Sequence, residues 1–292
     1  MSRLPVLVEE WARELRALNR SPQTVRAYIA DLAQLARWLG KPVEEATAED
    51  LRRFVRALHE AGLSARSRAR KVVAVRRFYE FLTASRGLPN PAERLEVPRV
   101  PRERVPRFMR EEEVSRLLAV IPRTVRGRRD RAIIELGLSG LRVGEIAGLR
   151  IQDLFLEEGQ VRITGKGGGE FLAFITPSAA RALQEWLDVR PGLTASEYVF
   201  IAVPPRGRGG LRPESMERIL KSYLRAAGIS AAYTMHSLRH TAGYVLANRD
   251  VPLHVIQEIL RHKDPRTTRI YTALSPAHVR EAMAAHLRFT RK

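Results

Sequence analysis

The sequence predicts a mainly α-helical protein of two domains, with a small antiparallel β-sheet in the second domain. Three observations lead to this prediction. Apolar residues recur at helical spacing over residues 1–100, a proline-rich stretch follows them, and two strand-like runs then flank a glycine-rich turn. The chain has 292 residues, of which 45% are hydrophobic, so it can bury two separate cores.

Four helices joined by short connections are expected in residues 1–100. Ser21 is placed to cap the second helix, with Pro22 in its first position, and Thr47 and Asp50 form a capping-box pattern before the third. The expected ranges are 6–18, 22–39, 51–61 and 64–87.

A connector is expected over residues 88–106, because the dense prolines of this stretch exclude a regular helix. We place the domain boundary near Val100, which gives a helical domain at residues 1–100 with a linker to 106, and a second domain at residues 107–292. A surface loop inside one domain is the alternative, but helical periodicity restarts at Glu111.

The second domain is expected to combine helices with one hairpin. Its two strands, 161–164 and 170–175, are joined by Gly-Lys-Gly-Gly-Gly. Helices are expected at 111–120, 128–138, 145–149, 178–189, 214–227, 236–248, 253–260, 266–271 and 277–287.

The chain is strongly basic, with a net charge of +19 and a pI of about 11.2. Residues 1–106 hold 21 basic and 13 acidic residues, and residues 107–292 hold 30 and 19, so both domains are positive. The charge is therefore not a basic tail, and two positive surfaces favour a clamp around a DNA duplex over a single docking patch. A solvated basic surface or an RNA-binding protein remains an alternative.

The chain contains no cysteine, which excludes disulfides and thiolate metal sites, although zinc bound by histidine and carboxylate stays open. The amino terminus lacks a signal-peptide pattern and no segment is long enough to span a membrane. We therefore expect a cytoplasmic protein.

His236, Arg239 and His240 are spaced to share one face of a helix at its first turn. Free N–H groups and the helix dipole favour an anion there, so the sequence indicates a phosphate site. A zinc helix is an alternative, although Ser237 stands where a metalloprotease needs glutamate. An ordinary capped helix with a surface arginine is another.

Arg142 follows a glycine turn, with Gly140 and Gly144 on either side and Glu145 three residues on. Glycines allow the backbone to approach a ligand closely. A surface arginine paired with Glu145 is the simpler interpretation of this motif taken alone.

Lys166 lies in the glycine-rich turn of the expected hairpin. The pattern is no P-loop, since a glycine follows the lysine and strands flank it on both sides. A long cation at a hairpin tip can reach a bound nucleic acid or a leaving oxygen, although a solvated turn lysine is more common.

Tyr271 follows His262 by nine residues. A phenol, with a pKa of about 10, becomes a nucleophile only when nearby cations stabilise the phenolate. A packing tyrosine is the alternative. The order of these motifs along the chain nevertheless suits cleavage of a DNA phosphate without a metal ion.

Together these motifs resemble the tyrosine recombinase family, in particular its Xer-type site-specific recombinases. The resemblance covers nearly the whole chain, and its main segments are Ser21–Tyr28, Asn90–Ala92, Gly140–Glu145, Gly165–Gly167, His236–Thr241, Ile256–His262 and Thr267–Tyr271. Arg261 departs from the family, which usually has glycine before the histidine, and Ala242-Gly243 replaces a bulky aromatic.

The resemblance implies a two-domain, C-shaped DNA clamp and a set of catalytic roles. Tyr271 would attack the scissile phosphate to give a 3′-phosphotyrosyl link, Arg142 and Arg239 would bind the non-bridging oxygens, and Lys166 would protonate the leaving 5′-oxygen. Neither a metal ion nor a cofactor is implied.

The remaining roles are supporting ones. His262 would donate a further hydrogen bond to the phosphate, and His236 would take the proton of the tyrosine. Glu145 would orient Arg142 and the histidine pair, of which His240 is the second member.

The implied function is site-specific recombination of double-stranded DNA through a Holliday junction, resolving chromosome or plasmid dimers. A mobile-element integrase, a type IB topoisomerase and a non-catalytic DNA-binding regulator are the alternatives. The implied assembly is a homotetramer, or a heterotetramer with a paralogue, with a septal DNA translocase as a further candidate partner. The last helix, near residues 277–287, would dock on the neighbouring subunit or on its own domain.

Overall fold

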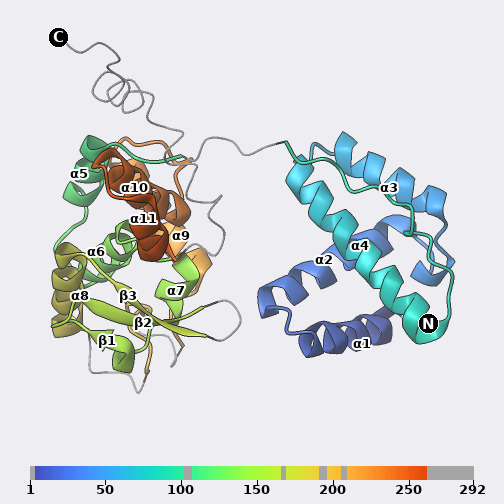
Figure 1. The fold of residues 1–292 in the computed structure, drawn as a ribbon, viewed down its shortest axis with the longest axis horizontal. Coiled ribbons are helices and arrows are strands. Elements are labelled where there is room, and N and C mark those ends of the chain that lie inside the picture. The colour runs from blue at the N-terminus through green and yellow to red at the C-terminus, as the bar shows by residue number, and fades with distance from the viewer. Residues whose placement is uncertain (1–3, 102–106, 166–168, 191–195, 205–208, 262–292) are drawn as a thin grey trace, which may run out of the picture. The chain divides into compact units, whose positions relative to one another are not determined.

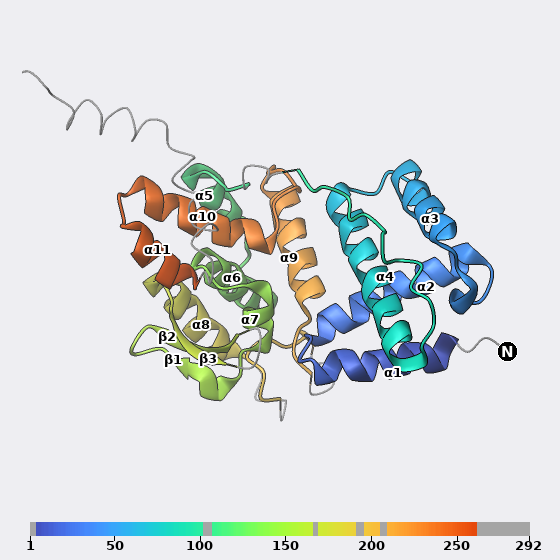
Figure 2. The same cartoon turned by 45° about the vertical axis from the view of Figure 1, so that its right-hand side comes forward.

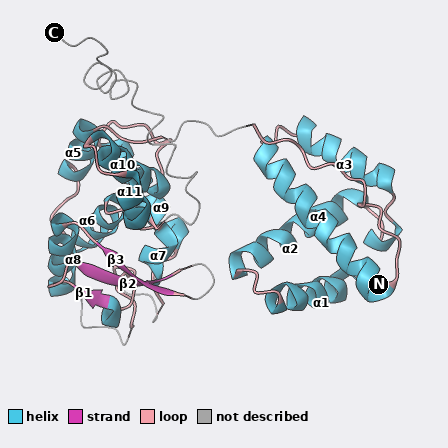
Figure 3. Ribbon diagram, viewed as in Figure 1, coloured by secondary structure: helices cyan, strands magenta, loops and turns pink. Residues whose placement is uncertain are grey.

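The computed structural model describes residues 4–101, 107–165, 169–190, 196–204 and 209–261. The chain forms two compact units, Met1–Glu103 and Arg104–Lys292. Helices make up the described secondary structure of the first unit, and the strands lie in the second (Figure 3). The predicted fold class, mainly α with a small antiparallel sheet in the second part of the chain, is confirmed.

The described residues of the first unit form four α-helices and one short 3-10 helix (Figure 1). Their bounds are α1 Leu4–Ala17, α2 Pro22–Leu39, η1 Val43–Glu45, α3 Ala48–Glu60 and α4 Ala65–Arg86. Ser21 caps α2 and Ser64 caps α4, each accepting a backbone N–H three residues on. Thr47 and Asp50 form the predicted capping box of α3, at 3.1 and 2.9 Å.

The core of the first unit combines aliphatic and aromatic side chains, and a buried carboxylate lies beside it. The rings of Trp11 and Phe78 meet edge to face, with centroids 5.3 Å apart. Asp31 on α2 is 2% exposed and accepts a hydrogen bond of 2.7 Å from Lys71 on α4. Arg70 also bonds this carboxylate. The burial of Asp31 therefore depends on α4.

The proline-rich stretch is only partly a connector. Ala92 and Leu95 are buried in the core of the first unit, and the Asn90 side chain accepts the N–H of Ala92 at 2.9 Å. The expectation of an extended linker from residue 88 onward is therefore wrong for residues 88–95. No helix forms among the described residues of this stretch, as the prolines predict.

The second unit contains seven described α-helices and a three-stranded sheet (Figure 2). Its helices are α5 Glu111–Ala119, α6 Val125–Leu138, α7 Val143–Gly148, η2 Ile151–Asp153, α8 Pro177–Val189, α9 Pro213–Ala226, α10 Met235–Asn248 and α11 Leu253–Leu260. The helices expected at 266–271 and 277–287 lie outside the described residues.

The sheet has the order β1-β2-β3, with both pairs antiparallel. Its strands are β1 Leu154–Phe155, β2 Gln160–Thr164 and β3 Glu170–Phe174, and Thr164 pairs with Glu170 next to the hairpin turn. The predicted hairpin is therefore confirmed. The additional strand β1 was not expected, because two residues are too few to show a period-two pattern.

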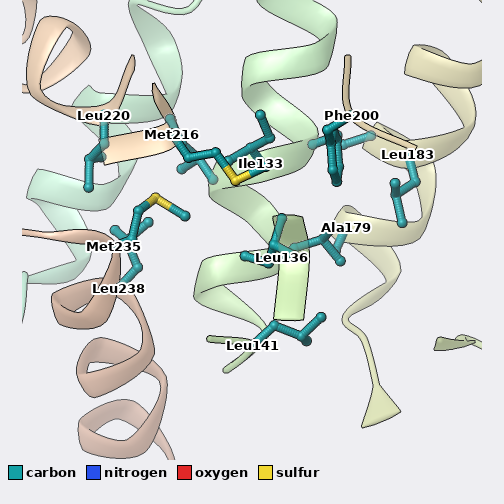
Figure 4. Packing of buried hydrophobic residues seen from close by; sticks show 14 of the residues in the cluster. Ile133, Leu136, Leu141, Ala179, Leu183, Phe200, Met216, Leu220, Met235 and Leu238 are labelled. Atoms are coloured by element: carbon teal, nitrogen blue, oxygen red, sulfur yellow. The ribbon is translucent and has the colours of Figure 1, made fainter. Parts of the chain in front are cut away.

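Helix α6 forms the centre of the second unit. Figure 4 shows Ile133 and Leu136 among side chains that include Leu183 of α8, Met216 of α9 and Leu238 of α10. Helices α8, α9 and α10 all pack against α6, which explains why this helix is buried on several faces. The carboxyl end of α6, and the turn at Gly140 after it, are thereby held in fixed positions.

No helix in the described parts of the chain combines the length and the apolar character that crossing a bilayer requires.

Candidate active site

Helix α10 carries the His/Arg motif, with His236 in its first turn and Arg239 and His240 in the next. Thr234 and Ser237 cap this helix reciprocally, with backbone-to-hydroxyl distances of 3.2 and 3.0 Å. Met235 and Leu238 on the same helix are buried in the core of the second unit. The apolar side of α10 therefore fixes its rotation, and with it the positions of the polar side chains.

Arg239 is the most deeply buried of the predicted phosphate ligands within the described residues, with 1% of its surface exposed. Its Nη1 donates to the carbonyl of Gly140, and its Nη2 donates to the carbonyl of Leu260. These carbonyls belong to the turn after α6 and to the last residue of α11. A carbonyl at a helix end has no partner inside the helix, and a cation there also complements the dipole. Arg239 thus joins three segments.

The turn at Gly140 depends on glycine. Gly140 has φ of 88°, and a Cβ added to it would lie 2.9 Å from Cδ2 of Leu260. Gly144 has no positive φ, and a Cβ added to it would have no neighbouring atom within 4 Å. At Gly140 the close neighbour is therefore the Leu260 side chain, and Gly144 has no such neighbour. The expected approach of a ligand to these glycines stays a prediction.

Arg142 precedes α7 and pairs with Glu145 in the first turn of that helix. The Glu145 carboxylate accepts the backbone N–H of Arg142 at 2.8 Å and its Nη1 at 2.7 Å. Nη2 of Arg142 donates to the carbonyl of Arg261 at 3.2 Å. The Arg142 side chain is 43% exposed, against 8% for Glu145. Glu145 and the Arg261 carbonyl thus hold the Arg142 guanidinium in place, and its exposed part is accessible to an anion.

Arg261 is a third guanidinium in this centre, and the sequence marks it only as a departure from the family pattern. Its Nη2 donates to Glu145 at 2.8 Å, and its Nη1 donates to the carbonyl of Ile259 at 3.0 Å. Its φ of 50° is left-handed, which costs a residue other than glycine about 1–2 kcal/mol. Its position directly before His262 is the signal that could have indicated a role.

The guanidiniums of Arg142, Arg239 and Arg261 lie together near the carboxyl ends of α6 and α11. They bond the carbonyls of Gly140, Ile259, Leu260 and Arg261, and Glu145 supplies the negative charge between two of them. Burial alone would raise the pKa of Glu145, but the backbone N–H of Arg142 and the charges of Arg261 and Arg142 outweigh it and lower the pKa. Three cations against one carboxylate leave this centre positive, as a phosphate site requires.

His236 and His240 lie next to each other on α10, with ring centroids 4.4 Å apart. Burial, followed by the charges of Arg239 and Arg142, lowers the pKa of His236 below 6.5. Burial, His236 and Arg239 lower the pKa of His240 to about 4. Both rings are therefore neutral at pH 7, and a neutral imidazole nitrogen can accept a proton.

The structure thus brings together five of the predicted residues: Arg142, Glu145, His236, Arg239 and His240. Lys166, His262 and Tyr271 lie outside the described residues. Thr164 and Glu170 pair on either side of the turn that contains Lys166, and α11 ends just before His262. Among the described residues, no group of three or more His, Asp or Glu side chains is arranged to hold a metal ion.

The second unit carries a basic centre built around α7, α10 and α11, which is typical of a protein that binds DNA phosphates. Comparison with known families identifies the family. Residues 107–278 match the phage integrase family, and residues 8–86 match the N-terminal SAM-like domain of phage integrases. The chain belongs to the phage integrase family, that of the tyrosine recombinases.

Within this family the chain is similar to Xer recombinases. It is 34% identical to tyrosine recombinase XerA of Pyrococcus furiosus over 282 residues, covering 95% of this chain and 92% of the relative. It is 33% identical to tyrosine recombinase XerD of Chlorobaculum tepidum over 297 residues, covering 95% and 97%. The predicted resemblance is confirmed, and the chain is an enzyme of site-specific DNA recombination.

Solved structures show the same fold. The crystal structure of XerH site-specific recombinase, bound to palindromic difH substrate in a post-cleavage complex, superposes with a TM-score of 0.71 at 19% identity. The match covers 96% of this chain and 84% of that one.

Proposed function

We propose that this recombinase cleaves and rejoins double-stranded DNA through a 3′-phosphotyrosyl intermediate. The observation that carries the proposal is the convergence of Arg142 and Arg239 on the end of α11, immediately before His262. Two guanidiniums held by helix-end carbonyls are fixed before the substrate arrives. Catalysis of phosphoryl transfer depends mainly on such positioning and on charge stabilisation.

In the cleavage step, the Oη atom of Tyr271 forms a bond to phosphorus and the bond from phosphorus to O5′ breaks. Neutral His236 takes the phenolic proton, and Lys166 gives a proton to the leaving O5′. Arg142, Arg239 and His262 bind the non-bridging oxygens. Rejoining is the reverse step with a 5′-hydroxyl of the partner strand, so the phosphotyrosyl bond keeps the energy of the broken ester and no nucleotide or metal ion is needed.

Glu145 and His240 have supporting roles in this scheme. Glu145 holds Arg142 by two hydrogen bonds, which fixes the guanidinium without neutralising the whole centre. His240 stays neutral beside His236 and therefore does not add a positive charge that would disfavour protonation of His236.

Both parts of the chain would contact the duplex, with residues 1–100 as the core-binding domain, a linker to 106 and residues 107–292 as the catalytic domain. Residues 1–106 carry a net charge of +8 and residues 107–292 one of +11, which supports contacts with phosphate from both parts of the chain. Each chain supplies one nucleophile, and exchange between two duplexes cuts four strands. The proposed assembly is therefore a tetramer, formed by this chain alone or with a paralogue.

The similarity to XerA and XerD favours resolution of chromosome or plasmid dimers in the cytoplasm, with a septal DNA translocase as a partner that triggers exchange. Integration or excision of a mobile element would use the same chemistry at different sites.

A nicked suicide substrate tests the proposed chemistry. Covalent cleavage positions are first mapped on DNA of the source genome to find the site, and a duplex is then built with a nick that releases the short 5′-hydroxyl fragment. The wild-type chain should form a covalent adduct at the 3′ end of the cut, and the Tyr271→Phe protein should form none. Tyr198→Phe, a change at a half-buried tyrosine stacked under Arg150, is the matched control. An adduct that survives in Tyr271→Phe would place the nucleophile elsewhere.

A further inference from the structure

Arg261 ends α11 in a backbone conformation that favours glycine. Its φ and ψ are 50° and 49°, and its N–H bonds the carbonyls of Gln257 and Glu258 at the end of the helix. Glycine would adopt this conformation without strain. An arginine at this position is therefore strained, and contacts of its side chain must compensate for the strain.

The guanidinium of Arg261 provides such a role, because it shares the carboxylate that holds Arg142. Oε1 of Glu145 accepts from Nη1 of Arg142, while Oε2 accepts from the Arg142 backbone and from Nη2 of Arg261. The Arg261 side chain is 15% exposed. Its Nε is buried without a hydrogen-bond partner in the described part of the chain. The side chain therefore interacts with its surroundings through its charge and its two Nη atoms.

The backbone of Arg261 makes a second contact with Arg142. Its carbonyl accepts Nη2 of Arg142 at 3.2 Å, so Arg142 is held on one side by Glu145 and on the other by the end of α11. The Arg261 guanidinium connects these two supports, since it bonds Glu145 and also the carbonyl of Ile259 in the same helix end.

We propose that Arg261 is a positioning residue for Arg142 in DNA cleavage. It draws Glu145 toward α11 and shares the negative charge of this carboxylate, so that Arg142 keeps both its orientation and its positive charge for the scissile phosphate. Without Arg261, Glu145 would pair with Arg142 alone, and the centre would lose one positive charge. This inference rests on the proposed role of Arg142 and deepens it.

Two substitutions separate the guanidinium from the backbone conformation. Arg261→Gly removes the side chain and suits φ of 50°, and Arg261→Asn tolerates the left-handed region without a cation. Both should form the covalent adduct on the suicide substrate about tenfold more slowly, within the range of coupling between neighbouring groups. Arg261→Lys should recover part of the rate. Arg249→Ala, which removes an exposed pair with Glu111, is the control and should cleave as the wild type does.

A substrate without charge at the scissile position tests the mechanism of this loss. In a methylphosphonate, a methyl group replaces one non-bridging oxygen, so the phosphate no longer needs a well-placed cation. The rate deficit of Arg261→Gly relative to the wild type should shrink on this substrate. A purely structural defect would give the same deficit on both substrates, because the folded fraction of a variant cancels when its two rates are compared.

A double-mutant cycle with Arg142→Ala completes the test. If Arg261 acts through Arg142, the Arg261→Gly change should add no further loss in the Arg142→Ala background. Additive losses, equal deficits on both substrates, or wild-type cleavage by both Arg261→Gly and Arg261→Asn would overturn the inference. The proposed function would stand in each of these cases as long as Tyr271→Phe forms no adduct, so the two failures are distinguishable.

Discussion

The imidazole rings of His236 and His240 lie with their centroids 4.4 Å apart and their planes at 73°, one turn apart on α10. Two protonated rings at this distance would repel each other, and Arg239 adds a positive charge to the same helix turn. The site therefore keeps both histidines neutral under physiological conditions, which suits the proposed transfer of the tyrosine proton to His236.

The first prediction concerns the dependence of stability on pH. Because the pKa of His240 is about 4 in the folded protein and 6.5 for an unperturbed histidine, the unfolded chain binds more protons between these values. The second unit should lose stability as the pH falls from about 6.5 to about 4. Urea denaturation of the wild type and of His240→Asn at several pH values measures this, and the variant should show a flatter dependence. Equal slopes for the two proteins would contradict the lowered pKa.

The second prediction compares the effects of alanine at Gly140 and at Gly144 on stability and on DNA cleavage. Gly140→Ala should destabilise the second unit by about 1–2 kcal/mol, because alanine is strained at φ of 88° and its Cβ approaches Leu260. The displaced Gly140 carbonyl should also slow DNA cleavage, since it accepts Arg239.

Gly144→Ala is the matched control for this change. Gly144 lies inside α7 in open space, and alanine should stabilise the helix by about 0.5–1 kcal/mol without changing cleavage. Thermal denaturation and adduct formation on the suicide substrate measure both effects. If the two variants behave alike, the turn conformation at Gly140 is not what orders the site.

Local features of this fold could be predicted from the sequence, and long-range ones could not. The capping box of Thr47 and Asp50 depends on neighbours three residues apart, so the pattern is visible in the chain itself. The pairing of Arg142 with Glu145, three residues on, was the simpler of the two interpretations of that motif, and it is present in the structure. Arg142 stays 43% exposed in this pair, so the pairing is compatible with its proposed role.

The surroundings of Arg239 and Arg261 had no such local signal. Arg239 bonds the carbonyl of Gly140, 99 residues away, and Arg261 bonds Glu145, 116 residues away. Every residue has a backbone carbonyl, so no sequence pattern indicates which carbonyls accept these hydrogen bonds. A left-handed helix end is expected at glycine, and the sequence has arginine there.

The third prediction concerns the buried carboxylate of the first unit. Asp31→Ala should destabilise this unit by about 3–5 kcal/mol, because Lys71 would remain buried without its counter-ion. Glu80→Ala removes an exposed partner of Arg77 at 3.4 Å and should cost about 0.5 kcal/mol or less. Scanning calorimetry of the full chain compares the two. A small effect for Asp31→Ala would mean that Lys71 reaches solvent once its partner is gone.

The fourth prediction uses the fork geometry of Arg239. Its two terminal nitrogens bond two carbonyls from different segments, and a lysine ammonium is too compact to reach both in the same way. Arg239→Lys should therefore keep the charge but lose cleavage by about a hundredfold or more, as for removal of a preorganised donor. Arg239→Ala should lose at least as much.

The stability of these two variants shows whether the loss is catalytic. Arg239→Ala removes the donor of the Leu260 carbonyl and leaves the Gly140 carbonyl with only the longer bond of 3.4 Å from Arg261. An unsatisfied buried group costs about 1–3 kcal/mol, but the change also removes a buried cation whose desolvation was unfavourable. The net destabilisation should be smaller than the loss of cleavage, which amounts to about 3 kcal/mol of barrier. Urea denaturation and adduct formation, measured on the same samples, compare the two. Cleavage by Arg239→Lys close to the wild-type rate would show that charge alone suffices, and that anchoring of the guanidinium by the ends of α6 and α11 has no part in the reaction.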